Sequence, residues 1–217
     1  MSYSPFIAPY NQLPETLPIF PLTGAIVMPG SELPLNIFEP RYLNMVSDAL
    51  STHRMIGMIQ PDPNGRDSHV LCHTGCAGRI TQYRETNDGR IEMVLSGVCR
   101  YDLAEELSTT RGYRLIVPEW SRFSDDYTNH EDQLHSEHDH LIRILKHYFD
   151  DKGLQTDWSV LERLSTVRLM NTMSMVLPIS EQDKQVLLET VEPAQRLHIF
   201  TSLLGDGFQA PGSVTRH

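Results

Sequence analysis

The sequence predicts an α+β protein in which a compact β-rich unit with one helix, residues 1–122, precedes a bundle of about four helices, residues 123–205. In the first part, short apolar runs separated by Pro and Gly are typical of short strands joined by tight turns. In the second part, apolar residues recur every three or four positions, which is the spacing of amphipathic helices. The composition becomes polar and acidic near Ser121, and this change predicts the boundary between the two parts. Residues 206–217 are expected to form a disordered tail.

In the stretch 17–50, three short apolar runs are each stopped by Pro or Gly and are followed by one helical pattern. The first run contains Pro18 and Pro21. Because proline cannot donate to a sheet ladder, we expect an edge strand or a strand entry there. Pro40 suits the first turn of a helix, where its missing N–H is not needed. The predicted strands are residues 17–22, 25–28 and 32–38, and the predicted helix begins at residue 40.

Turn residues separate the remaining strands of the first part. Gly75 and Gly78 interrupt one strand and suggest a bulge or a close backbone approach. Asp88 and Gly89, which lie between two alternating runs, predict a hairpin turn, and Gly97 is expected to bend the chain after the return strand. The number and spacing of the strands predict a small, strongly bent sheet or barrel. The predicted strands are residues 55–59, 70–83, 91–95, 98–103 and 113–120.

Local signals predict where the helices of the second part begin and end. Gly153 is expected to end the first helix, because glycine readily adopts the left-handed conformation found after helix ends. Ser159 and Glu162 have the spacing of a capping box and predict the start of a second helix, which Pro178 ends. The further signals are Ser180 with Asp183 at the start of a third helix, Pro193 at the start of the last, and Gly205 at its end.

The composition excludes several classes of function. The net charge is −10 and both halves are acidic, so the chain has no electrostatic surface for a nucleic-acid backbone and we expect no nucleic-acid partner. No apolar run reaches the ~20 residues that a membrane helix needs, and the start lacks the segments of a signal peptide, so we expect no membrane association. Three cysteines form no evident disulfide framework, which favours a reducing compartment and predicts a cytoplasmic protein.

Several short motifs, in their order and spacing, resemble one known family. The residues that carry the resemblance are Pro21-Leu22, Pro29-Gly30, Leu33-Pro34-Leu35, Ile37-Phe38-Glu39-Pro40-Arg41-Tyr42, Gly78-Arg79-Ile80, Asp88-Gly89-Arg90, Leu95-Ser96-Gly97, Arg100, Leu177-Pro178-Ile179-Ser180, Asp183-Lys184-Gln185 and Arg196. The pattern is similar to the amino-terminal, substrate-binding domain of the ATP-dependent protease Lon. It is most similar to free-standing bacterial proteins that consist of that domain alone, and the likeness covers residues 17–204.

This resemblance implies a PUA-like β-barrel followed by helices, and a module that recognises unfolded or degron-bearing polypeptide. A protease is then a further candidate partner. The chain has no G-x-x-x-x-G-K-[ST] sequence to hold nucleotide phosphates, and no serine lies in the catalytic motif of the family. We therefore expect a substrate-binding module without the ATPase and protease modules, which is not an enzyme and uses no cofactor.

The most specific block of the resemblance supplies the candidate site residues Phe38, Glu39, Arg41 and Tyr42, to which Arg100 is added. Under a functional interpretation they lie near a recognition groove between the β unit and the helix. Under a structural interpretation Glu39 caps the helix, Arg41 forms an ion pair, Tyr42 packs, and Arg100 forms an ion pair that defines the fold. The residue types favour the structural interpretation.

Histidines concentrate around one predicted helix and give the alternative hypothesis, a small metal-dependent hydrolase. His135 and His138 are spaced i, i+3, so both could face one metal ion. The group lacks an H-E-x-x-H pattern, however, and each member suits a solvated helix face, so no metal is predicted. The group consists of His130, His135, His138, His140 and His147 with Glu131, Asp132, Glu137 and Asp139.

Cys72 and Cys76 have C-x3-C spacing with His73 between them. A tetrahedral zinc site needs a second pair of ligands, and only Cys99 is left to contribute. We therefore interpret these cysteines as small residues embedded in strands.

Overall fold

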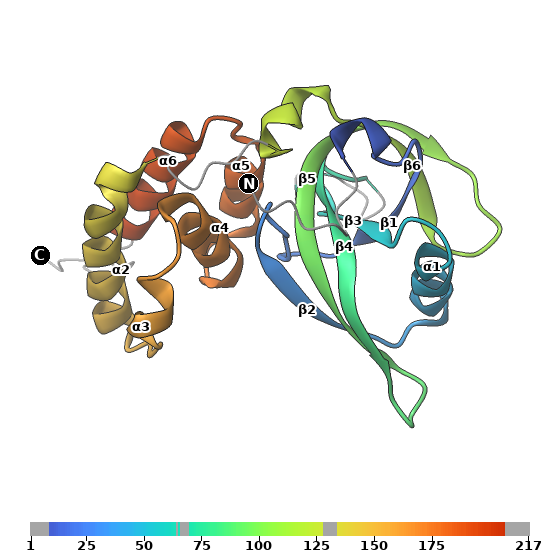
Figure 1. Ribbon diagram of the computed structural model, residues 1–217, viewed down its shortest axis with the longest axis horizontal. Helices are drawn as coiled ribbons and strands as arrows, with labels where there is room; N and C mark the ends of the chain where they lie inside the picture. The colour runs from blue at the N-terminus through green and yellow to red at the C-terminus, as the bar shows by residue number, and fades with distance from the viewer. Residues whose placement is uncertain (1–8, 64, 66–69, 128–133, 207–217) are drawn as a thin grey trace, which may run out of the picture.

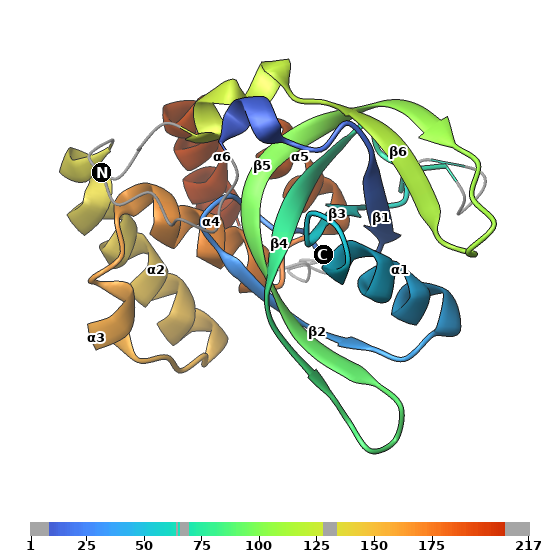
Figure 2. The ribbon, with the colours of Figure 1, turned by 45° about the vertical axis from the view of Figure 1, so that its right-hand side comes forward.

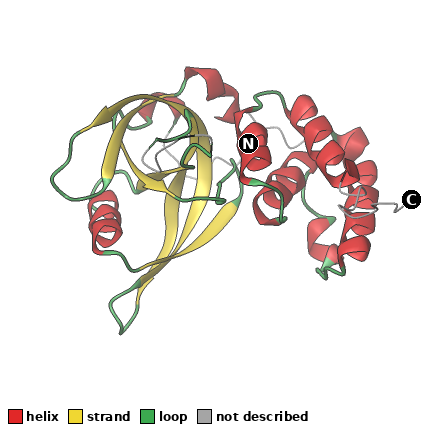
Figure 3. Ribbon diagram, turned by 180° about the vertical axis from the view of Figure 1, so that it is seen from behind, coloured by secondary structure: helices red, strands yellow, loops and turns green. Residues whose placement is uncertain are grey.

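The computed structural model describes residues 9–63, 65, 70–127 and 134–206. A curved six-stranded sheet with one helix occupies one side of the molecule, and five helices occupy the other (Figures 1 and 3). The predicted α+β class is therefore confirmed. The strands are β1 Leu17–Pro21, β2 Glu32–Ile37, β3 Met55–Ile59, β4 Thr74–Glu85, β5 Ile91–Leu107 and β6 Arg114–Glu119. The helices are α1 Pro40–Leu50, α2 His138–Lys152, α3 Trp158–Leu161, α4 Thr166–Val176, α5 Glu181–Glu189 and α6 Pro193–Asp206. Short 3-10 segments are Tyr10–Gln12, Ser121–Tyr127 and His135–Glu137.

The sheet closes on itself, although residues 91–95 and 98–103, which were predicted as two strands with a bend at Gly97, form the single strand β5. The strand order of the sheet is β2-β5-β4-β3-β1-β6, and the far end of β5 pairs again with β6 (Figure 2). All neighbours are antiparallel except β1 and β3. The long strand β5 thus contacts β2, β4 and β6 and holds the barrel together.

A close backbone approach at Gly78 allows the strong bend. The register of β4 and β5 shifts between Ala77 and Gly78. A Cβ atom on Gly78 would lie 2.4 Å from Cγ of Leu95, which is closer than real Cβ contacts come. The bulge that the glycine pattern suggests is therefore present.

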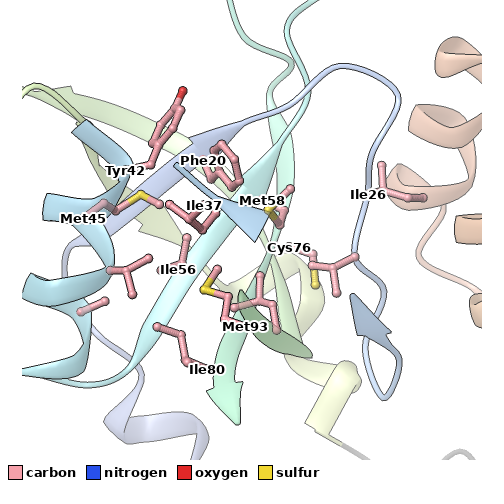
Figure 4. Close-up of a cluster of buried hydrophobic side chains, with 14 of the residues drawn as sticks. Phe20, Ile26, Ile37, Tyr42, Met45, Ile56, Met58, Cys76, Ile80 and Met93 are labelled. Atoms are coloured by element: carbon pink, nitrogen blue, oxygen red, sulfur yellow. The ribbon is translucent and has the colours of Figure 1, made fainter. Parts of the chain in front are cut away.

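Apolar side chains of the barrel and of α1 form a shared core (Figure 4). The ring of Tyr42 on α1 lies 4.3 Å, centroid to centroid, from the ring of Phe20 on β1. Met45 and Val46, one turn further along α1, are fully buried against the same strands. The apolar face of the predicted helix 40–50 therefore seals one side of the barrel.

Two further predictions for the first part are wrong. Residues 25–28 form no strand; Ile26, Val27 and Met28 are buried in the connection between β1 and β2. The β-branched side chains of Ile26 and Val27 therefore reflect burial in a loop and not pairing in a strand. Of the two alternatives predicted for the first run, the edge strand is wrong, because β1 lies between β3 and β6, whereas a strand entry agrees with Pro18 as the second residue of β1. Its parallel register with β3 begins at Ile19, so the missing N–H of Pro18 removes no bond to β3.

The predicted ends of the helices are mostly confirmed. Gly153, with φ 63°, ends α2, and α6 begins at Pro193. The Ser180 hydroxyl accepts the Asp183 N–H at 3.1 Å and caps α5. Gly205, in contrast, does not stop α6, which continues through Asp206.

The capping box predicted at Ser159 is wrong. Asp157 is the N-cap residue, because its side chain accepts the Ser159 N–H at 3.0 Å. The helix that it starts, α3, lasts only one turn. A second cap, Ser165, then starts α4, so the single predicted helix is two helices.

The predicted boundary of the β-rich part near residue 122 falls inside the 3-10 segment Ser121–Tyr127 and stays a prediction.

Helical and β-rich parts share both core and hydrogen bonds. Met175 and Leu188 are buried in the same apolar cluster as the barrel core. The Asn171 amide donates to the Pro29 carbonyl at 3.1 Å, and Lys184 Nζ donates to the Gly24 carbonyl at 3.0 Å. The two parts are thus joined along the β1–β2 connection.

In the described part of the chain, no helix is both long and apolar enough to cross a membrane.

Candidate functional site

The start of α1 presents a paired set of charges. Glu39 is the N-cap residue, but its side chain makes no capping bond. Its carboxylate instead accepts from Arg41, 2.9 Å from Nε and 2.8 Å from Nη2, and both side chains are about half exposed. The Arg41 guanidinium also lies 4.6 Å from the centre of the Tyr42 ring. The predicted ion pair of Arg41 and the packing of Tyr42 are therefore confirmed, whereas capping by the Glu39 side chain is wrong.

Phe38, just before this helix, is an exposed aromatic residue. Its side chain is 62% exposed, although Ile37 beside it is buried in the core. The guanidinium of Arg90, from the turn between β4 and β5, lies 5.8 Å from the centre of the Phe38 ring. An exposed ring beside cations is suited to contact another molecule, because aromatic residues and arginine contribute most to protein interfaces.

Phe38 lies beside a three-stranded ribbon formed by β2, β5 and the outer half of β4, and the β4–β5 hairpin extends beyond the rest of the barrel (Figures 1 and 2). β3 pairs with β4 only as far as Arg79. Among the described residues, Thr81–Glu85 of β4 therefore has a strand neighbour only in β5, and β2 likewise has only β5. The ribbon has two edges that are open to an additional strand.

The outer half of β4 has main-chain groups that face away from the sheet. Thr86 N–H donates to the Arg90 carbonyl at 2.9 Å, and hydrogen-bonded and non-bonded pairs alternate in an antiparallel ladder. It follows that the N–H and C=O groups of Tyr83 and Glu85 point away from β5. The Tyr83 side chain is 52% exposed, and this segment contains no proline. Pro34, in contrast, interrupts the edge of β2.

Arg100 lies far from these four residues and is only 2% exposed. It is nine positions along β5 from Ile91, the residue that pairs with Ile37, which is about 30 Å in an extended strand. Its guanidinium forms a bidentate pair with Asp126, 2.7 Å from Nη2 to Oδ1 and 3.0 Å from Nε to Oδ2. It also donates to carbonyl oxygens of the α5–α6 connection, those of Leu188, Thr190 and Val191. The predicted ion pair is confirmed and joins the two parts of the fold.

A second polar cluster supports the same junction around Asp102. Thr74 Oγ1 donates to the Asp102 carboxylate at 2.6 Å, and Arg122 Nη1 donates to it at 3.2 Å. Burial acts to raise the pKa of Asp102, but the hydrogen bond from Thr74 and the charge of Arg122 outweigh it and lower the pKa below its usual value. Asp102 is therefore ionised at neutral pH and pairs with Arg122, whose Nη2 also donates to the Glu189 carbonyl at 2.9 Å.

The three cysteines are buried and free. Cys76 on β4 and Cys99 on β5 lie in paired strands, whereas Cys72 precedes β4. Burial raises the pKa of Cys72 to about 11 and also raises the pKa values of Cys76 and Cys99. Their position in and beside the strands agrees with the interpretation of these residues as part of the β unit.

We expect the three thiols of the native protein to react slowly with a disulfide reagent at pH 7.5. The thiolate is the reactive form, and burial suppresses it at all three positions. Absorbance of the released thiol should show three equivalents promptly in denaturant and only slow release without it. A full equivalent released at once by the native protein would contradict this expectation.

His135 and His138 line a pocket of about 410 Å³ at the start of α2. Glu162 lines the same pocket, but no group of three or more His, Cys, Asp or Glu residues that could hold a metal ion occurs within the residues that the structure describes. His140 and His147 are exposed on α2. Glu137 and Asp139 are exposed around the start of α2, and the remaining members of the predicted group, His130, Glu131 and Asp132, lie outside the described residues.

Comparison with known proteins identifies the family. The model of the ATP-dependent protease La (LON) substrate-binding domain matches residues 16–206. The chain belongs to this Lon substrate-binding domain family. It is 26% identical over 206 residues to the Lon protease of Heliobacterium modesticaldum and 22% identical over 202 residues to that of Endomicrobium trichonymphae. Each alignment covers 89% of the chain and 24% of the relative, so the chain spans about a quarter of the length of these Lon proteases.

Solved structures show the same fold. The Lon N-terminal domain protein from Xanthomonas campestris superposes with a TM-score of 0.64 at 24% identity, over 86% of this chain and 97% of that chain. The N-terminal domain of the Mycobacterium avium complex Lon protease superposes with a TM-score of 0.66 at 17% identity, over 88% of this chain and 98% of that chain. The arrangement of a Lon N-terminal domain is therefore shown for nearly all of the described chain.

Sequence reasoning did not find Tyr83, Arg90 or Asp126. Tyr83 and Arg90 belong to the exposed surface because β4 extends beyond β3. How far one strand extends beyond its neighbour leaves no signal in the local sequence. Asp126 lies in a polar stretch whose acidic residues all resemble one another in sequence. The Asp88-Gly89 turn, which places Arg90 beside Phe38, is the one signal that would have pointed to this surface.

Proposed function

We propose that this Lon-type domain binds extended segments of unfolded or degron-bearing polypeptide, without catalysis, at the end of the barrel formed by Phe38, the Glu39–Arg41 pair and the open edge of β4. Membership of a substrate-binding domain family supports polypeptide as the class of ligand. The single observation that supports the location is the exposed Phe38 ring, which lies within a family motif and follows β2, across β5 from the open edge of β4.

Main-chain pairing would supply affinity at this surface. An extended peptide can add a strand to an exposed sheet edge, and side-chain contacts then provide selectivity. The outward N–H and C=O groups of Tyr83 and Glu85 are suited to such pairing. The Phe38 ring, at the end of β2 on the other edge of the ribbon, is suited to contact an apolar side chain.

The charges at this surface are arranged to accept a neutral segment. Glu39 pairs with Arg41, Asp88 pairs with Arg90, the arginine beside the Phe38 ring, and Glu92 pairs with Arg84, whereas Glu32 and Glu85 make no ion pair among the described residues. A peptide that contacts the ring of Phe38 therefore meets no strong field of either sign. This arrangement favours recognition of apolar sequence, as expected for a protein that binds unfolded chains.

A separate protease remains a candidate partner of the domain. The three buried free thiols support a cytoplasmic location.

We expect Phe38→Ser to weaken binding of a permanently unfolded polypeptide about tenfold, which corresponds to ~1.4 kcal/mol for a contact of this type. Fluorescence anisotropy of a labelled, reduced and carboxymethylated protein would give the Kd. Val176→Ser is a matched control, because Val176 on α4 is 63% exposed and lies in the other part of the fold.

A backbone variant tests the strand edge in the same assay. Glu85→Pro removes an N–H that faces away from β5, whereas Glu85→Ala removes only the side chain. We expect the first to weaken binding and the second to leave it unchanged. The location is wrong if Phe38→Ser, Glu85→Pro and Val176→Ser all bind as the wild type does. The class of ligand is wrong if the wild-type protein binds no unfolded polypeptide.

A further inference from the structure

The pocket in the helical part is lined by basic and hydroxyl side chains that the proposed function does not use. Its volume is about 410 Å³, within the range of small-molecule sites. Its lining residues are His135, His138, Glu162, Arg163, Leu164, Ser165, Thr166 and Arg168. They come from the 3-10 segment and the first residue of α2, and from the α3–α4 connection with the first turn of α4, which are separate segments that the fold brings together.

Two arginines at this pocket lack a carboxylate partner. Within the part of the chain that the structure describes, neither Arg163 nor Arg168 makes an ion pair, although most other arginines of this acidic protein do. The acidic residue of the lining, Glu162, is neutralised by Lys146, with Nζ 2.7 Å from Oε1. The pocket therefore carries a net positive charge in a chain whose net charge is −10.

Apart from the apolar Leu164, the remaining lining residues are histidines and hydroxyl-bearing residues. His135 and His138 each have an imidazole N–H, and Nδ1 of His138 lies 3.5 Å from Thr166 Oγ1. The Thr166 hydroxyl donates to the Leu134 carbonyl at 2.9 Å, which fixes the start of α4 against the start of α2. Two guanidinium groups and two imidazoles around one cavity are suited to an oxyanion, because arginine binds phosphate groups through two parallel N–H bonds.

We propose that this pocket binds a small phosphate anion with more than one phosphoryl group, of the size of pyrophosphate. Two separate arginines can each bind one phosphoryl group. The cavity is larger than a single orthophosphate ion needs. A metal ion is a poorer fit, because the cations at the pocket would repel it and the described residues supply no set of three ligands.

Titration calorimetry with inorganic pyrophosphate and with orthophosphate, in a chloride buffer of low ionic strength, tests the proposal. We expect pyrophosphate to bind more tightly than orthophosphate, and Arg163→Gln with Arg168→Gln to weaken pyrophosphate binding at least tenfold. The control is Arg84→Gln with Arg90→Gln, which removes the same charge from the β4–β5 hairpin. This control should change the Kd less than twofold.

Amide chemical shifts of the wild-type protein provide a second, independent readout. Addition of pyrophosphate should shift the resonances of residues 134–138 and 162–168 and leave those of the hairpin in place. The proposal is overturned if pyrophosphate gives neither heat nor shifts, if both double variants weaken binding equally, or if the shifts lie elsewhere. Because the pocket and the β4 edge are in different parts of the fold, failure of one proposal does not affect the other.

Discussion

Replacing Arg100 with methionine is expected to lower the free energy of unfolding by about 3–5 kcal/mol, the usual cost of removing one partner from a buried ion pair. The change would leave the Asp126 carboxylate buried without its cation and the carbonyls of the α5–α6 connection without their donor. The methionine side chain keeps much of the packing against the Phe123 ring, over which the guanidinium lies at 4.5 Å. The loss would therefore report mainly the missing charge and hydrogen bonds.

Urea unfolding followed by tryptophan fluorescence measures this loss. The chain has one tryptophan in each part, Trp120 at the end of β6 and Trp158 in α3, so single-tryptophan variants report the two parts separately. Arg84→Met, which removes an exposed pair with Glu92, is the control and should have no measurable effect. A change below 1 kcal/mol in Arg100→Met would contradict the role of Arg100 in joining the two parts.

Features that depend on neighbouring residues could be predicted from the sequence. The Asp88-Gly89 turn, the cap at Ser180 and the start of α6 at Pro193 are local, and all are present. The cap at Ser159 was misplaced because Asp157, two positions earlier, accepts the N–H of Ser159 itself and so starts the helix before it. Local signals therefore identify which elements exist better than they identify where each element begins.

Features that depend on distant residues could not be predicted. The motif pointed to Arg100, but its acceptors lie 26 and 88–91 positions further along the chain, and no periodicity connects them. The run 25–28 shows the same limit, because burial in a loop and pairing in a strand both select β-branched residues. In the helical part, the spacing of His135 and His138 correctly suggested a shared surface. The arginines that decide its charge come from another segment.

The candidate site contains features of both kinds, those that depend on neighbouring residues and those that depend on distant residues. The resemblance supplied Phe38, Glu39, Arg41 and Tyr42, and the structure places all four around the start of α1. The open edge of β4 depends on β3 beginning at Met55, opposite Arg79, while the antiparallel β4 continues to Glu85, which is a property of the closed sheet. A sequence signal exists for each strand but not for the difference between their lengths.

Gly97→Ala is expected to destabilise the protein by about 3 kcal/mol, at the upper end of the range for overpacked sites. A Cβ atom at this position would lie 2.1 Å from the carbonyl oxygen and 2.7 Å from the carbonyl carbon of Met28. Both are backbone atoms and cannot rotate away. Gly97 also donates to the Ser31 carbonyl at 2.8 Å and accepts from the Gly30 N–H at 3.0 Å, so the two segments cannot separate without straining these bonds.

Because the hydroxyls of Ser31 and Thr172 lie 3.3 Å apart, a shift of the β1–β2 connection should also disturb α4. Chemical denaturation with both tryptophans as reporters would detect this as a loss of stability in both parts. Gly205→Ala is the matched control: no atom lies within 4 Å of its added Cβ, and alanine in place of glycine within a helix typically adds about 0.5–1 kcal/mol. If Gly97→Ala were as stable as the wild type, the close approach of Gly97 to the Met28 backbone would not restrict this position to glycine.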